Sequence, residues 1–93
     1  MLSSAYKIPG GKLVKIKLWP DAERVERITI LGDFFLHPEE VIVTIEESLV
    51  GTKIEINALV KVITDVLQQS EAKLIGASAE DIAEAIMIAW KSK

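Results

Sequence analysis

The stretch KLVKIKLWPDAERVERITI, residues 12–30, decides the fold of this 93-residue chain. Between Lys12 and Trp19 the apolar side chains alternate with lysines, and this period of two indicates a half-buried β-strand. Pro20-Asp21 then favours a type I turn, because proline suits its first central position and a polar residue its second. A second strand follows, in which Val25 is out of phase with the later isoleucines, so a β-bulge or a late strand start is required. The two strands are predicted to pair as an antiparallel hairpin.

Three helical segments follow the hairpin. Pro38 fits the first position of a helix that Gly51 ends, and the two glutamates after Pro38 lie near the positive end of the helix dipole. A second helix runs from about residue 55 or 57 to residue 69. The last helix is the clearest, since Ser78 can cap its start with Asp81 three residues later.

The order of these segments is β-β-α-α-β-α once a short extended piece over residues 72–75 is counted as a third strand. Helices that gather on one face of a small antiparallel sheet form a two-layer α+β fold. We therefore expect a single domain over residues 1–93, with a sheet of two to three strands and three helices on one face.

The composition excludes several kinds of chemistry. About half of the residues are apolar (49%) and 27% are charged, which is typical of a compact globule. The chain has no cysteine, which excludes disulfides, thiol nucleophiles and thiolate metal sites, and its single histidine cannot form a histidine metal cluster. No nucleophile, base and orienting group stand together, and the glutamate pairs at 39–40 and 46–47 are interpreted as ordinary helix acids. We expect no catalytic residue and no metal ligand.

The sequence also bears on location and partners. No stretch is long and apolar enough to cross a bilayer, and the N-terminus lacks the pattern of a signal peptide, so we expect a cytoplasmic location. The first twenty residues hold four lysines and no acid, a charge of +4, whereas the remaining 73 residues carry −7. An acidic total with few aromatic residues argues against a nucleic-acid partner. The early lysines are either a solvated strand face or a surface for a phosphate or an acidic partner.

The segment Ile8-Pro9-Gly10-Gly11-Lys12 is the first candidate site. Paired glycines let the backbone approach a ligand or another chain closely, and Lys12 would point along the same edge. The segment is not a Walker A loop, because it lacks that spacing and no helix follows it. The alternative is a plain turn that leads into the strand.

The segment LGDFFLHP, residues 31–38, is the second candidate site. If the strand continues in phase, Leu31 and Phe35 lie on the sheet face away from the helices, where exposed apolar groups invite association. Alternatively, the chain bends at Gly32 and places both Phe34 and Phe35 in one core. Asp33 is expected to accept hydrogen bonds from backbone amides at the entry to the following helix.

Three segments, taken in order, resemble a known family. They are YKIPGGKLV at residues 6–14, GDFF followed by PEE at residues 32–40, and GASAEDI at residues 76–82, ahead of the closing helix. Together they resemble the accessory C-terminal domain of lipoate–protein ligases, and the resemblance extends from about Tyr6 to Trp90. The ordered set of three is more specific than any one of the segments.

The resemblance implies a division of labour between two chains. In that family a large catalytic subunit binds lipoate and ATP with Mg²⁺, forms lipoyl-adenylate, and passes the lipoyl group to a lysine of an acceptor lipoyl domain. The accessory domain is a separate polypeptide in some archaea and bacteria, is required for the adenylation step, and has a fold similar to the SufE/NifU type. The chain would then be the small subunit of a heterodimer, with no activity and no bound cofactor of its own.

The resemblance also suggests which residues face the large subunit. The candidates belong to the segment at residues 8–12, which we call the glycine turn, and to the segment at residues 31–38. They are Gly10, Gly11, Lys12, Leu31, Gly32, Asp33, Phe34 and Phe35. Lys7 and Lys12 would add positive potential near the triphosphate of ATP.

Two other interpretations stay open on the residues alone. One is a non-catalytic scaffold of the SufE/NifU type that docks onto an unrelated partner, although the lack of cysteine argues against direct sulfur or cluster chemistry. The other is a homodimeric module that uses its apolar sheet face on itself, which size-exclusion chromatography of the isolated chain would detect.

Overall fold

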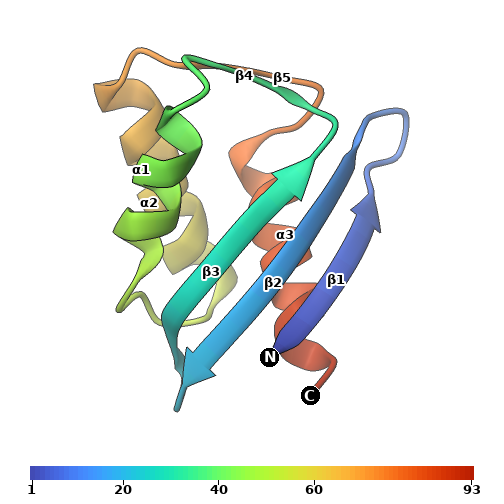
Figure 1. Cartoon of the computed structure of the whole chain (residues 1–93), viewed down its shortest axis with the longest axis vertical. Coiled ribbons are helices and arrows are strands. Elements are labelled where there is room, and N and C mark those ends of the chain that lie inside the picture. The colour runs from blue at the N-terminus through green and yellow to red at the C-terminus, as the bar shows by residue number, and fades with distance from the viewer.

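Three antiparallel strands form the main sheet of the computed structural model, which describes residues 1–93 (Figure 1). They are β1 (Leu2–Lys7), β2 (Leu13–Asp21) and β3 (Arg24–Gly32), and β2 lies in the centre. The hairpin predicted from the sequence is confirmed as β2–β3. Strand β1 was not predicted, because its inward-facing positions include Ser4, whose polarity masks the apolar alternation. The Ser4 hydroxyl donates a hydrogen bond of 2.7 Å to the Ala85 carbonyl.

The β2–β3 hairpin contains the bulge that the sequence required. Pro20 pairs with Val25, and Glu26 is the extra residue in β3. The predicted turn at Pro20-Asp21 is wrong, because both residues still belong to β2 and the loop is Ala22-Glu23. Ala22 has a φ of 54°, a left-handed conformation that lets a two-residue loop match the twist of its strands.

The helices are α1 (Val41–Leu49), α2 (Ile56–Gln69) and α3 (Ala79–Lys91), and they leave one face of the sheet uncovered (Figure 1). Helix α3 contacts β1 and β2, α1 contacts β3, and α2 packs against both other helices. The predicted start of the first helix at Pro38 is wrong by three residues. Residues 38–40 form a turn, in which the Val41 N–H donates to the Pro38 carbonyl at 3.1 Å.

The other helix boundaries follow their sequence signals. Gly51 lies just beyond α1 with a φ of 86°, which glycine adopts without a Cβ penalty. Helix α3 begins with a capping box: the Asp81 N–H donates to the Ser78 hydroxyl at 3.1 Å, and the Ser78 N–H donates to the Asp81 carboxylate at 3.0 Å. These bonds satisfy backbone donors that a helix start leaves free.

A second sheet of two strands closes one end of the molecule, at the top of Figure 1. Strands β4 (Phe35–His37) and β5 (Lys73–Ile75) pair antiparallel there. The extended piece predicted over residues 72–75 is therefore a strand, but it pairs with β4 and does not join the main sheet. The third strand of the main sheet is β1 instead.

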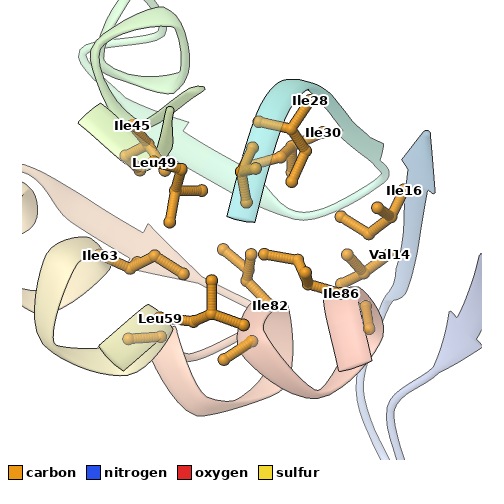
Figure 2. Close-up of a cluster of buried hydrophobic side chains, with 14 of the residues drawn as sticks. Val14, Ile16, Ile28, Ile30, Ile45, Leu49, Leu59, Ile63, Ile82 and Ile86 are labelled. Atoms are coloured by element: carbon orange, nitrogen blue, oxygen red, sulfur yellow. The ribbon is translucent and has the colours of Figure 1, made fainter. Parts of the chain in front are cut away.

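The core is apolar throughout. Side chains from β2 and β3 meet side chains from all three helices (Figure 2). The residues labelled in that view are Val14, Ile16, Ile28, Ile30, Ile45, Leu49, Leu59, Ile63, Ile82 and Ile86. No polar or charged side chain is buried, so every group that can meet a partner or a ligand lies at the surface. The α+β class is confirmed, and no helix is long and apolar enough to span a bilayer.

Candidate protein-interaction site

The three sequence segments singled out above meet at one end of the fold, which we call the motif end (residues 8–13, 32–35 and 75–78). The Lys12 N–H donates to the Gly76 carbonyl at 3.3 Å, which joins the β1–β2 turn to the loop before α3. The Leu13 N–H donates to Asp33 Oδ1 at 2.7 Å, which joins the same turn to the segment after β3. Residues that are far apart in the sequence therefore form one surface.

The glycine turn is held by internal hydrogen bonds and packs closely against the loop before α3. The Gly11 N–H donates to the Ile8 carbonyl at 2.8 Å, and the Ile8 N–H donates to the Lys12 carbonyl at 3.0 Å. A Cβ at Gly11 would lie 2.9 Å from the Ile8 side chain and 3.2 Å from the Gly76 carbonyl oxygen. The close backbone approach that the paired glycines predicted is thus made to another loop of the same chain. Gly10, by contrast, has open space where a Cβ would stand.

Of the two candidate lysines, Lys12 belongs to the motif end and Lys7 lies directly before it, at the end of β1. The Lys7 ammonium donates to the Gly11 carbonyl, and the stem of Lys12 crosses Gly76 so closely that a Cβ there would stand 2.6 Å from Lys12 Cγ. The Lys12 ammonium has neither a carboxylate nor a carbonyl partner within the chain. It is therefore free to meet an anionic group on another molecule.

The chain bends at Gly32, where β3 ends, and this bend separates the two phenylalanines. A Cβ at Gly32 would lie 2.3 Å from the Leu13 carbonyl oxygen and 2.6 Å from the Phe34 ring. Phe34 is half-buried against the core, whereas 70% of Phe35 is exposed. The two alternatives from the sequence are therefore each half right: one ring packs inward and the other points to solvent.

The predicted role of Asp33 needs a correction. Asp33 does accept a hydrogen bond from a backbone amide, but the donor is Leu13 at the start of β2 and not a residue at the helix entry. The first amides of α1 are instead bonded locally, because the N–H groups of residues 41–43 donate to the carbonyls of residues 38–40.

An exposed apolar patch overlaps the motif end and consists of Leu31, Phe35 and Ile75, which are 48%, 70% and 63% exposed. Phe35 and Ile75 stand opposite each other in the β4–β5 pair. Beside Leu31 and Phe35 the surface is hollowed by an open depression of about 300 Å³, to which Phe34 and Ile42 also contribute. The exposure of Leu31 and Phe35 is confirmed. Ile75 was not predicted, because only the pairing of β5 with β4 brings it beside Phe35.

A second residue that the sequence did not identify is Glu46. Its carboxylate accepts a hydrogen bond of 2.8 Å from the Ile30 N–H, so α1 satisfies a donor on the outer edge of β3. Glu46 does lie on a helix, as interpreted, and the structure adds its contact with β3. No group of three or more His, Cys, Asp or Glu side chains is arranged to hold a metal ion.

The chain is similar to known proteins both in sequence and in fold. A family model described as "Bacterial lipoate protein ligase C-terminus" matches residues 2–86. Lipoate-protein ligase A subunit 2 of Thermoplasma acidophilum is 39% identical over 62 residues, and the match spans 66% of this chain and 65% of that relative's length. A chain in the solved structure of an archaeal lipoylation system from the same organism, a bi-partite lipoate protein ligase and its E2 lipoyl domain, matches with a TM-score of 0.78. It is 31% identical, and the match covers 92% of this chain and 94% of that one.

Proposed function

Because the chain belongs to the bacterial lipoate protein ligase C-terminal family, we propose that it acts as the small subunit of a two-chain lipoate–protein ligase. The catalytic partner activates lipoate with ATP to lipoyl-adenylate and transfers the lipoyl group to a lysine of an acceptor lipoyl domain. The observation that carries the proposal is the motif end. Three segments typical of the family converge there beside an exposed apolar patch, on a fold whose core contains no polar group.

The chain contributes to catalysis by stabilising one conformation of its partner. An adenylating site must order its loops around lipoate, ATP and Mg²⁺, and a subunit that binds the ordered arrangement better raises its population. Each ~1.4 kcal/mol of differential binding raises that population about tenfold. We assign ATP, Mg²⁺ and lipoate to the catalytic subunit.

The motif end and the apolar patch are the surface that we assign to the catalytic subunit. An exposed aromatic residue beside aliphatic ones is a common anchor of protein interfaces, because its burial removes a large apolar area from water. Phe35 and Ile75 fit this description, since about two thirds of each side chain is exposed. Gly11, Gly32 and Asp33 hold the backbone of this surface in place. Gly10 supplies the positive φ of the turn, and Phe34 packs inward beside Gly32.

The direct test measures lipoate-dependent pyrophosphate release by the purified catalytic subunit with and without this chain. We expect the chain to raise the rate at least tenfold, and the same rate in both mixtures would contradict the proposed function. A Leu31→Ala/Phe35→Ala double variant should lose most of the stimulation. The matched control is Val43→Ala/Val50→Ala, which removes two valines that are 50% and 52% exposed on and after α1, and it should stimulate like the wild type.

Lys12 is the residue that we place nearest the triphosphate, because its ammonium has no partner within the chain. A Lys12→Ala variant should raise the KM of the complex for ATP and leave the KM for lipoate unchanged. Lys61→Ala, on the exposed side of α2, serves as the control. If Lys12→Ala left the KM for ATP at the wild-type value, Lys12 would have to be placed away from the nucleotide, and the same measurement on Lys7→Ala decides the position of Lys7.

Two further points belong to the same proposal. We place the complex in the cytoplasm, where ATP is available. Fractionation of cells, with detection of the chain by an antibody, tests this location. We also expect the SufE/NifU likeness that the family resemblance implied. Superposition of β1–β3 and α3 onto a SufE or NifU structure tests that expectation.

A further inference from the structure

The face of the β1–β3 sheet opposite α3 has no element across it (Figure 1). The strand register identifies the residues that point out from this face: Lys15 pairs with Leu31, Lys17 with Thr29, and Trp19 with Arg27. On the adjoining strand, Lys7 pairs with Leu13 and continues the same face. We call the set Lys7, Lys15, Lys17, Trp19 and Arg27 the basic sheet face.

The basic sheet face carries four cations, and no carboxylate lies between the Lys7–Leu13 pair and the Trp19–Arg27 pair. Beyond the bulge the next outward pair is Asp21 with Arg24, one acid and one cation. Glu26 in the bulge and Asp33 at the other end are the remaining acids that flank the face. Lys15, Lys17 and Arg27 form no ion pair, since the ion pairs of the chain are Lys53–Glu55 and Lys61–Asp65. The charge of this face is therefore not neutralised from within.

The rest of the chain has the opposite charge. The whole chain carries −3 and the face +4, which leaves −7 for the remaining residues. Such separation of charge over a molecule 32 Å in its longest dimension creates a field that orients an approaching charged partner. It also opposes a symmetric dimer through this face, because the four cations of one copy would meet the four of the other.

The apolar groups on this face favour a folded protein as the occupant. The guanidinium of Arg27 stacks on the Trp19 ring at 4.5 Å from its centroid, and Trp and Arg are enriched at the centres of protein interfaces. Leu31 belongs both to the row of Lys15 and to the apolar patch with Phe35. The basic sheet face and the apolar patch are therefore continuous and can be covered by a single partner.

We propose that the basic sheet face docks against an acidic surface of the catalytic subunit and steers the association of the two chains. This inference rests on the proposed function. It adds that the basic sheet face orients the two subunits and that electrostatic attraction is the force that does so. Complementary charge of this kind acts mainly on the rate of association, which it raises about 10- to 1,000-fold at low salt. The apolar patch then supplies the contacts that slow dissociation.

The test measures the association and dissociation rates of the two purified subunits by stopped-flow fluorescence. The ionic strength is varied from about 20 to about 500 mM, because salt begins to screen interactions between surface charges strongly within this range. The test variant is Lys15→Glu/Lys17→Glu. The matched control is Lys61→Glu/Lys91→Glu, which changes the net charge equally but on helices α2 and α3. We expect the wild-type association rate to fall steeply with salt. The test variant should associate about tenfold more slowly at low salt, with a flatter salt dependence and a nearly unchanged dissociation rate.

Several outcomes would overturn the inference while leaving the proposed function intact. One is a complex whose association rate does not depend on salt, and another is a test variant that associates as fast as the wild type. Equal slowing by the test and control variants would assign the effect to net charge and not to this face. Tight binding of a DNA oligonucleotide probe to the wild type, lost in Lys15→Glu/Lys17→Glu, would assign the face to nucleic acid instead. If wild-type chains formed no complex at any salt concentration, the proposed function itself would fail.

Discussion

Asp33 and Leu13 exchange two hydrogen bonds: the Leu13 N–H donates to Asp33 Oδ1 at 2.7 Å, and the Asp33 N–H donates to the Leu13 carbonyl at 3.3 Å. This pair extends the β2–β3 ladder by one step beyond the last strand residue, Gly32. It holds the bend after which Phe34 turns inward and Phe35 turns outward. The aspartate of the GDFF segment therefore shapes the bend at the candidate interface.

Replacing Asp33 should lower stability by a modest amount. Asp33→Ala removes the acceptor of a short hydrogen bond at an exposed site, so we expect the free energy of unfolding to fall by about 1 kcal/mol. Asp33→Asn keeps an oxygen acceptor and should cost less. Urea unfolding followed by circular dichroism measures both. Asp65→Ala, which breaks only the exposed pair with Lys61, should change stability by less than about 0.5 kcal/mol. Equal stabilities of the wild type and Asp33→Ala would contradict this role.

Gly32 and Gly10 should differ sharply in their tolerance of alanine. At Gly32 a Cβ would lie 2.3 Å from the Leu13 carbonyl oxygen, which is backbone and cannot move aside, so Gly32→Ala should cost about 2 kcal/mol or more. At Gly10 the space is open and only the φ of 70° is unfavourable, so Gly10→Ala should cost about 1 kcal/mol. Thermal unfolding of the two variants side by side checks the order. A Gly10→Ala protein less stable than Gly32→Ala would show that the close approach at Gly32 is not the dominant constraint.

Glu46 should matter to stability and its neighbour Glu47 should not. Glu46→Ala leaves the Ile30 N–H without its 2.8 Å acceptor on a part-buried edge, which should cost about 1–2 kcal/mol. Glu47 is exposed and makes no side-chain hydrogen bond or ion pair, so Glu47→Ala should stay within about 0.5 kcal/mol of the wild type. Hydrogen exchange at the Ile30 amide gives a local readout, and it should become faster only in Glu46→Ala. Unchanged protection of that amide would mean that the bond does not persist in solution.

Ile75 provides a test of the interface that the sequence did not suggest. Because 63% of Ile75 is exposed, Ile75→Ala should change the stability of the isolated chain by less than about 0.5 kcal/mol. It should nevertheless weaken binding to the catalytic subunit about tenfold, which corresponds to roughly 1.4 kcal/mol. Isothermal titration calorimetry with the catalytic subunit measures this effect. Ile88→Ala, at a position on α3 that is 38% exposed, should bind like the wild type, and equal affinity of the two variants would remove Ile75 from the interface.

The sequence by itself determined the local features of this protein. The alternation from Lys12 to Trp19 specified a half-buried strand, Ser78 with Asp81 specified the start of the last helix, and Gly51 marked the end of the first. The exposure of Phe35 was one of two alternatives that the sequence left open, and the structure decided it. Each of these signals depends on residues within about one helical turn or a few strand positions, so no knowledge of the rest of the chain is needed.

Only the tertiary structure decided which distant residues meet. It added β1 to the sheet, placed Ile75 beside Phe35, set Gly76 under Lys12, and brought Glu46 to the edge of β3. These contacts join residues separated by long stretches of chain, and no local period or cap encodes them. These contacts depend on how the helices pack against the sheet, because that packing positions the loops between them. The packing in turn depends on the shared apolar core, to whose stability all of the core residues contribute together.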